Sequence, residues 1–128
     1  MPNSENKTIV AALSDLMFTV KIQEAAKRAG LQVKFVKTDE DVLAKAKDDK
    51  PKLIILDLNC GSIDAIGLVK SLKSDPDLRK IYVISFLSHV QGELKQSAHD
   101  AGCDMVLARS AFSQNIVQIF QRQGGIVV

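Results

Sequence analysis

The chain has 128 residues, enough for one domain around a single hydrophobic core. Hydrophobic residues make up 46% of it and charged residues 25%, which is typical of globular proteins. A net charge of only +2, without a basic run, argues against nucleic-acid binding, and no apolar stretch approaches the ~20 residues that span a bilayer. Because the polar N-terminus lacks a signal-peptide core, we expect a cytoplasmic protein that does not bind membranes.

The first part of the chain predicts two strand–helix units. Residues 8–13 are apolar and indicate a strand, after which Ser14 can cap a helix. The apolar stripe expected on this helix has four members: Leu16, Val20, Ala26 and Ala29. Residues 32–36 alternate between polar and apolar and indicate a strand nearer the sheet edge. Thr38 or Asp39 is expected to cap the short helix that follows.

Residues 52–57 are the centre of the pattern, because four consecutive apolar residues end there on the carboxylate of Asp57. The run is too short for a buried helix and lies between Pro51 and Gly61, so it predicts a strand buried on both faces of a parallel sheet. Asp57 would emerge at the carboxyl end of that strand, where ligands collect in open α/β sheets. Aspartate is also common at the start of loops, and position alone does not separate these two roles.

The rest of the chain predicts two more strands and three more helices. The strands are expected at residues 81–86 and 105–108, and Asp64 can cap the helix between the third and fourth strands. The last two helices carry apolar residues at helical spacing: Val90, Leu94, Ala98 and Ala101, then Phe112, Ile116, Ile119 and Phe120. Five alternating units predict an α/β fold, with helices on both faces of a five-stranded parallel sheet of order 2-1-3-4-5.

Under this order the carboxyl ends of four strands open toward one crevice. The residues expected at those ends are Leu13, Ser14, Asp15, Asp57, Asn59, Leu87, Ser88, His89 and Arg109. Neither His89 nor His99 has a nucleophile at a recognisable spacing, so we expect no hydrolase chemistry. The domain is expected to span residues 7–122, with flexible ends at 1–6 and 123–128.

Cys60 and Cys103 lie far apart in the sequence, with no second ligand at metal-binding spacing. We expect two free thiols in a reducing compartment. Both cysteines fall near predicted strand ends, which leaves a disulfide as the alternative.

The chain resembles the receiver domain of bacterial two-component response regulators over roughly residues 7–122. After Asp57, five residues fall at the family's spacing: Asn59, Asp64, Leu68, Val69 and Leu72. Residues 102–104, followed by Val106, Leu107 and Arg109, resemble the family's Gly-Ala-Asp strand and terminal lysine. The resemblance implies two-component signal transduction through a phosphorelay. Asp57 would be the phosphoacceptor, modified by a histidine kinase.

The chain departs from the family at the expected metal site. The two acidic positions at the end of the first strand hold Leu13 and Ser14. Asp15, one step later, is either a ligand or simply a residue that suits a helix N-terminus. The Mg²⁺ site implied by the resemblance, made of Asp15, Asp57 and the carbonyl of Asn59, is therefore weakened.

The residues that the family uses for switching are also replaced. Leu87 stands where the family has a hydroxyl, and Val106 where it has an aromatic ring. Ser88 either supplies the hydroxyl or only caps the next helix, so Ser88 and Arg109 are the candidate phosphate contacts. Ser110 replaces the proline that follows a cis peptide in the family, which predicts a different path into the last helix.

Arg109 takes the place of the family's lysine, and it can grip a carboxylate with two hydrogen bonds. We hypothesise that Arg109 binds Asp57 directly, in place of metal and phosphate. Asp57 would then stay ionised and paired, and Asp57→Asn would lose stability.

The predicted function is a receiver-type signalling domain that acts by protein–protein interaction, with atypical or absent phosphorylation. It is not expected to be an enzyme, beyond at most self-phosphorylation at Asp57. Its partner would be a sensor kinase or a downstream effector, bound through the fourth and fifth helices, which could also form a homodimer.

Two other functions remain as alternatives. The first is a working Mg²⁺-dependent phosphoacceptor that uses the same crevice residues. The second is a flavodoxin-like cofactor-binding domain. The sequence argues against this alternative, because the first predicted strand is not followed by a glycine-rich loop.

Overall fold

The structure, a computed structural model, describes residues 7–88 and 92–123. It contains one sheet of five parallel strands in the order β2-β1-β3-β4-β5, which confirms the predicted topology. The strands are β1 (Thr8–Ala12), β2 (Gln32–Val36), β3 (Leu53–Asp57), β4 (Tyr82–Leu87) and β5 (Met105–Ala108). The helices are α1 (Leu16–Arg28), α2 (Asp39–Asp49), α3 (Ala65–Ser74), α4 (Gly92–Ala101) and α5 (Arg109–Gln123).

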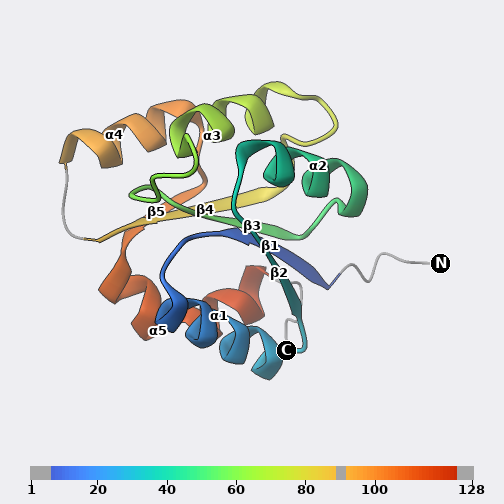
Figure 1. The fold of residues 1–128 in the computed structure, drawn as a ribbon, viewed down its shortest axis with the longest axis vertical. Helices are drawn as coiled ribbons and strands as arrows, with labels where there is room; N and C mark the ends of the chain where they lie inside the picture. The colour runs from blue at the N-terminus through green and yellow to red at the C-terminus, as the bar shows by residue number, and fades with distance from the viewer. Residues whose placement is uncertain (1–6, 89–91, 124–128) are drawn as a thin grey trace.

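The sheet is the middle of three layers. Helices α1 and α5 cover one face, and α2, α3 and α4 cover the other (Figure 1). Strand β3 supplies both cores, because Ile54 and Leu56 face one layer of helices while Leu53 and Ile55 face the other. All five residues of β3 are buried, as the continuous apolar run predicts, and Asp57 is the last of them.

Helix α1 presents a different face to the core from the one expected. Its buried residues are Phe18, Ile22, Ala25 and Ala26, with Ala29 buried just beyond the helix. Leu16 is 81% exposed and Val20 is 55% exposed, so the predicted stripe is wrong at its first two members. Since residues 16 and 18 lie about 200° apart around a helix, burying Phe18 and Ile22 turns Leu16 and Val20 to the surface.

Of the three predicted helix caps, the one on α1 is wrong by one residue and the other two are confirmed. Asp15, rather than Ser14, caps α1, while Thr38 and Asp64 cap α2 and α3. The fourth strand begins and ends one residue later than expected, which is an ordinary difference for an element boundary.

Helix α5 starts at Arg109, directly after β5, without an intervening loop. Peptide bonds in the described residues are all trans, and Cys60 and Cys103 are buried free thiols. Among helices of the described residues, none has the length and apolar character needed to cross a membrane. The expectations for His89, Val90 and the chain ends at 1–6 and 124–128 concern residues outside the described ranges.

Candidate functional site

Asp57 lies at the mouth of the sheet, where β3 ends. It is only 4% exposed, and its Oδ1 accepts a hydrogen bond of 2.9 Å from the backbone N–H of Asn59. Its Oδ2 has no hydrogen-bond partner among the described residues. Burial raises the pKa of Asp57 above its ordinary value, and the hydrogen bond from Asn59 and the charge of Arg109 offset this only in part.

Asp15 caps α1, and each of its two carboxylate oxygens accepts one hydrogen bond. Its Oδ1 accepts from the backbone N–H of Phe18 at 3.1 Å, and its Oδ2 accepts from Nη1 of Arg109 at 2.8 Å. The capping hydrogen bond, together with the positive charge of Arg109, holds the pKa of Asp15 below its usual value. Asp15 thus lies at the N-terminus of α1, one of the two alternatives weighed for it, and it forms the cap that was expected at Ser14.

Arg109 pairs with Asp15, not with Asp57 as hypothesised. Its guanidinium lies over two aromatic rings, 5.2 Å from the centroid of Phe18 and 5.9 Å from that of Phe86. Those rings belong to the core on the α1 side of the sheet, so cation–π attraction holds the guanidinium beside Asp15. Its Nε is buried and has no hydrogen-bond partner among the described residues.

Phe18 and Phe86 were not foreseen as parts of the site. They belong to a cluster in which Phe86 and Phe112 stack with centroids 5.5 Å apart and Phe18 meets Phe86 edge-on at 5.0 Å. A usable signal was present, because Phe18 follows the capping Asp15 by three residues and therefore lies beside it on the helix. Its ring is the surface on which Arg109 rests.

Ser88 and Asn59 join the loops that follow β4 and β3. The backbone N–H and the hydroxyl of Ser88 both donate to Oδ1 of Asn59, at 2.8 and 3.1 Å. Ser88 is exposed at the crevice, whereas Leu87 and Val106, at the family's switch positions, are buried apolar residues. The structure thus brings five predicted site residues to one edge of the sheet, in two groups. Arg109 binds Asp15 in one group. In the other, Asn59 is hydrogen-bonded to both Asp57 and Ser88.

The residues at this edge fit a divalent cation poorly. Mg²⁺ prefers near-octahedral oxygen ligands, including one or two carboxylates. Asp15 has one oxygen committed to the helix cap and the other to Arg109, which leaves Asp57 and the carbonyl of Asn59. In the described part of the chain, no three His, Cys, Asp or Glu side chains gather closely enough to hold a metal ion.

A hollow of about 410 Å³ opens beside the Asp15–Arg109 pair. Its lining includes Met17, Phe18, Lys21 and Ser88.

The fold recurs in solved response regulators. The phosphorylated cyanobacterial phytochrome response regulator RcpA matches with a TM-score of 0.82 and 21% identity, over 96% of this chain and 97% of that chain. The Mn²⁺-bound response regulator Rcp1 matches with a TM-score of 0.79 and 17% identity, over 95% and 97%. The chemotaxis response regulator CheY4 of Vibrio cholerae matches with a TM-score of 0.78 and 18% identity, over 91% and 97%.

The sequence comparisons are weaker. No protein-family model matches the chain. The response regulator protein VraR of Staphylococcus saprophyticus is 26% identical over 86 residues, which are 67% of this chain but only 40% of that protein. Together with the site geometry, the structural matches establish that this chain has the fold of a response-regulator receiver domain.

Proposed function

We propose that the chain is a receiver-type signalling domain that works by binding another protein, with Asp57 at the phosphoacceptor position and Mg²⁺-dependent phosphorylation weak or absent. The observation that carries this proposal is the double engagement of Asp15. Its two oxygens bind the α1 cap and Arg109, so it does not supply the carboxylate that a cation beside Asp57 would need.

The charge balance at the crevice supports the same reading. A phosphoryl group brings several negative oxygens toward a carboxylate, and a divalent cation normally neutralises that charge. Here the nearby cation is Arg109, which already rests on Phe18 and Phe86 and pairs with Asp15. Asp57 is instead surrounded by protein that raises its pKa, which favours the protonated, non-nucleophilic form relative to an exposed aspartate.

A working phosphoacceptor is the second candidate, and one observation favours it. Oδ2 of Asp57 is not used by any described residue, so it is available as a nucleophile. The phosphorylated form of RcpA is a solved structure with the same fold. In this alternative Ser88 and Arg109 would hold the phosphoryl oxygens, which requires Arg109 to leave Asp15.

The partner is proposed to be a sensor kinase or a downstream effector. The surface of α4 and α5 remains a predicted contact and a predicted homodimer interface. Beside α5, a hollow of about 250 Å³ is lined by Met105 and Leu107 of β5 and by Ile119 of α5, which are half-buried and compatible with either role.

Incubation with acetyl phosphate and Mg²⁺, followed by intact-mass measurement, separates the two candidates. We expect little or no gain of a phosphoryl mass in the natural chain. Ser14→Asp adds a carboxylate at an exposed position beside the crevice, and we expect it to increase Mg²⁺ affinity and the phosphorylated fraction. A rapid, nearly complete mass gain in the natural chain that disappears in Asp57→Ala would establish the working phosphoacceptor instead.

A further inference from the structure

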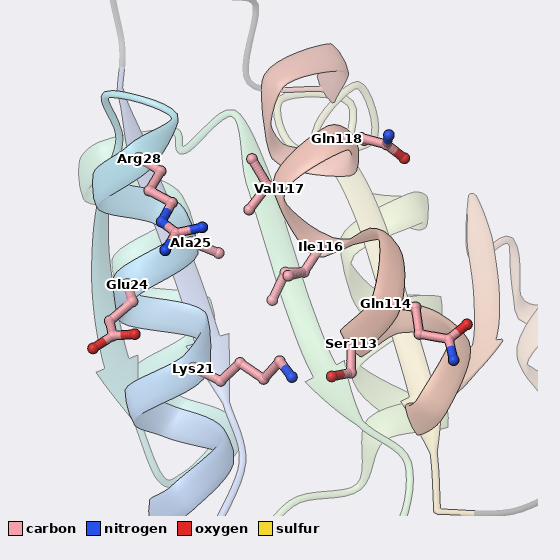
Figure 2. A pocket seen from close by; sticks show the side chains of 9 residues that line it. All are labelled: Lys21, Glu24, Ala25, Arg28, Ser113, Gln114, Ile116, Val117 and Gln118. Atoms are coloured by element: carbon pink, nitrogen blue, oxygen red, sulfur yellow. The ribbon is translucent and has the colours of Figure 1, made fainter.

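A space of about 520 Å³ lies between helices α1 and α5 (Figure 2). Its floor is apolar, because Ala25 and Ile116 are buried there and Val117 lies half-buried beside them. The small side chain of Ala25 leaves the middle of the space open. In volume and in its apolar floor the space resembles the sites that bind small molecules, which add a few charged or polar groups to such a floor.

Two cations reach into this space from α1. Lys21 and Arg28 project between the two helices, whereas the carboxylate of Glu24 points away from α5 (Figure 2). A glutamate four residues before an arginine is a favourable helical pair, yet Glu24 does not pair with Arg28. Neither cation has an ion-pair partner in the described part of the chain. Both charges are therefore free to bind an anion beside the apolar floor.

The opposite wall, from α5, carries no charge. Ser113, Ile116 and Val117 point from it toward α1, and the other α5 residues that line the space are glutamines (Figure 2). Lys21 and Arg28 are seven positions apart on α1, which is about two turns or about 10 Å along the helix. A ligand that satisfies both cations must therefore be elongated, with an anionic group at each end.

We propose that this space binds an elongated small-molecule dianion, with one anionic group at Lys21, the other at Arg28 and an apolar body over Ala25 and Ile116. The guanidinium of Arg28 can grip a carboxylate or a phosphate with two hydrogen bonds, and the ammonium of Lys21 acts as a point charge. This inference goes beyond the proposed function, because it gives the chain a chemical effector in addition to a protein partner. It does not depend on the phosphorylation state of Asp57.

Other small molecules fit this space less well. A cation would be repelled by Lys21 and Arg28, and the carboxylate of Glu24 does not face the space to attract it (Figure 2). A monoanion would leave one of the two cations without a counter-ion. A dianion with a polar body would gain nothing from covering the apolar floor at Ala25 and Ile116.

The test titrates biphenyl-4,4′-dicarboxylate, a rigid apolar core with a carboxylate at each end, into the ¹⁵N-labelled full chain. Backbone amide shifts followed by NMR give both the affinity and the location. We expect saturable binding with a Kd below about 1 mM. The shifts should be concentrated at residues 21–28 and 113–118, which include the lining of the space. Biphenyl-4-carboxylate should bind about three-fold more weakly and the neutral dicarboxamide about ten-fold more weakly, because exposed ion pairs are lost.

Two double variants give the matched comparison. Lys21→Gln/Arg28→Gln should weaken binding of the dicarboxylate about ten-fold and remove its advantage over the monocarboxylate. Lys70→Gln/Lys95→Gln removes as many exposed charges on α3 and α4 and should leave both unchanged. Val117→Trp fills the space without altering the charge and should abolish binding, with urea unfolding to verify that this variant is folded. The bisphosphate of 4,4′-biphenol, titrated in parallel, shows which anionic group the space prefers.

Several results would overturn the proposal. They are the absence of saturable binding by both dianions, equal affinities for the dianion and the neutral dicarboxamide, shifts centred away from α1 and α5, and unchanged affinity in the Lys21/Arg28 variant. Tighter binding of either the dicarboxylate or the bisphosphate supports the proposal and names the anionic group. Phosphorylation of Asp57 in the mass experiment would refute the proposed function without altering these outcomes.

Discussion

A short ion pair lies at each end of the sheet, and the two pairs have very different surroundings. At the amino-terminal edge, Nζ of Lys73 lies 2.7 Å from Oδ2 of Asp104. At the carboxyl-terminal edge, Nη1 of Arg109 lies 2.8 Å from Oδ2 of Asp15. The lengths are nearly equal, so the difference lies in what surrounds each pair.

Lys73 is saturated with partners. Besides Asp104, its ammonium group donates to the backbone carbonyls of Arg79 at 3.0 Å and Ile81 at 2.8 Å. Asp104 in turn accepts from the backbone N–H of Val83 at 2.8 Å. All three ammonium donors are used, and the pair ties the end of α3 to the starts of β4 and β5.

Arg109 holds a looser position. Among the described residues, Nη1 donates to Asp15 and Nε is buried without a hydrogen-bond partner. The guanidinium also lies over the faces of Phe18 and Phe86. The comparison teaches that the amino-terminal edge is fixed by complete hydrogen bonding, whereas the opposite edge keeps unused donors. Parallel α/β sheets generally bind their ligands at that second edge.

The largest expected effect is at the saturated pair. Lys73→Met keeps the apolar stem but removes three donors, and we expect it to lower the free energy of unfolding by about 2–3 kcal/mol. Urea unfolding would measure the change. Lys70→Met, at an exposed position one turn earlier on α3, is the control and should change stability by less than about 0.5 kcal/mol. Equal effects of the two variants would show that the hydrogen bonds of Lys73 contribute nothing beyond helix propensity.

The strands and their order in the sheet are predicted correctly from the sequence, because the signals that define them are local. Leu53, Ile54, Ile55 and Leu56 are apolar without alternation, which only a strand covered on both faces explains. Alternation of five such strands with helices then leaves few topologies, and the observed order is the predicted one. The position of Asp57 at the crevice follows from these two facts alone.

The sequence does not determine which face of α1 is buried. Leu16 and Val20 form one apolar row, and Phe18 and Ile22 form another on the opposite side of the same helix. Both rows satisfy helical periodicity. Packing of Phe18 against Phe86, 68 residues away in sequence, selects the second row, and local patterning carries no information about that contact.

The ion-pair partner of Arg109 could not be predicted either, because it also depends on contacts between residues far apart in the sequence. Asp57 ends β3, and Asp15 follows the neighbouring strand β1, so the sequence offers no basis for choosing between the two carboxylates. The rings of Phe18 and Phe86 decide, because they support the guanidinium on the α1 side.

The second expected effect concerns Asp57 itself and has the opposite sign to our hypothesis from the sequence. Because burial raises the pKa of Asp57, ionisation costs free energy in the folded state. Asp57→Asn removes that cost and keeps an oxygen for the N–H of Asn59, so we expect a gain of about 1 kcal/mol at pH 7. The gain should shrink as the pH falls through the folded pKa and vanish below the ordinary aspartate pKa of 3.8, where the carboxyl is protonated in both the folded and the unfolded state.

Urea unfolding of both proteins between pH 3 and pH 8 would measure this dependence. Asp48→Asn, at an exposed position on α2, is the control. It should not increase the free energy of unfolding at pH 7, because the carboxylate of Asp48 is not buried. A loss of stability in Asp57→Asn at pH 7 would mean that the folded protein stabilises Asp57 as an anion, contrary to the expected effect of burial.

The smallest effect on stability is expected at the looser pair. Arg109→Met removes one partly exposed ion pair and two cation–π contacts, but it also removes a buried N–H that has no partner. We therefore expect a loss below about 1 kcal/mol, in contrast to Lys73→Met. The pKa of Asp57 should rise further, because the charge of Arg109 lowers it in the natural chain. Carboxyl ¹³C shifts followed by NMR during a pH titration would measure that change, with Lys95→Met on α4 as the control.

A loss in Arg109→Met as large as that in Lys73→Met would show that the two edges are equally rigid. An unchanged pKa of Asp57 would show that Arg109 exerts no field across the crevice. A small loss of stability combined with a raised pKa would mean that Arg109 acts on the charge of its neighbours more than on the fold. A cation in that position can change partners without unfolding the sheet, because the strands beneath it are held by β3 and by the Lys73–Asp104 pair.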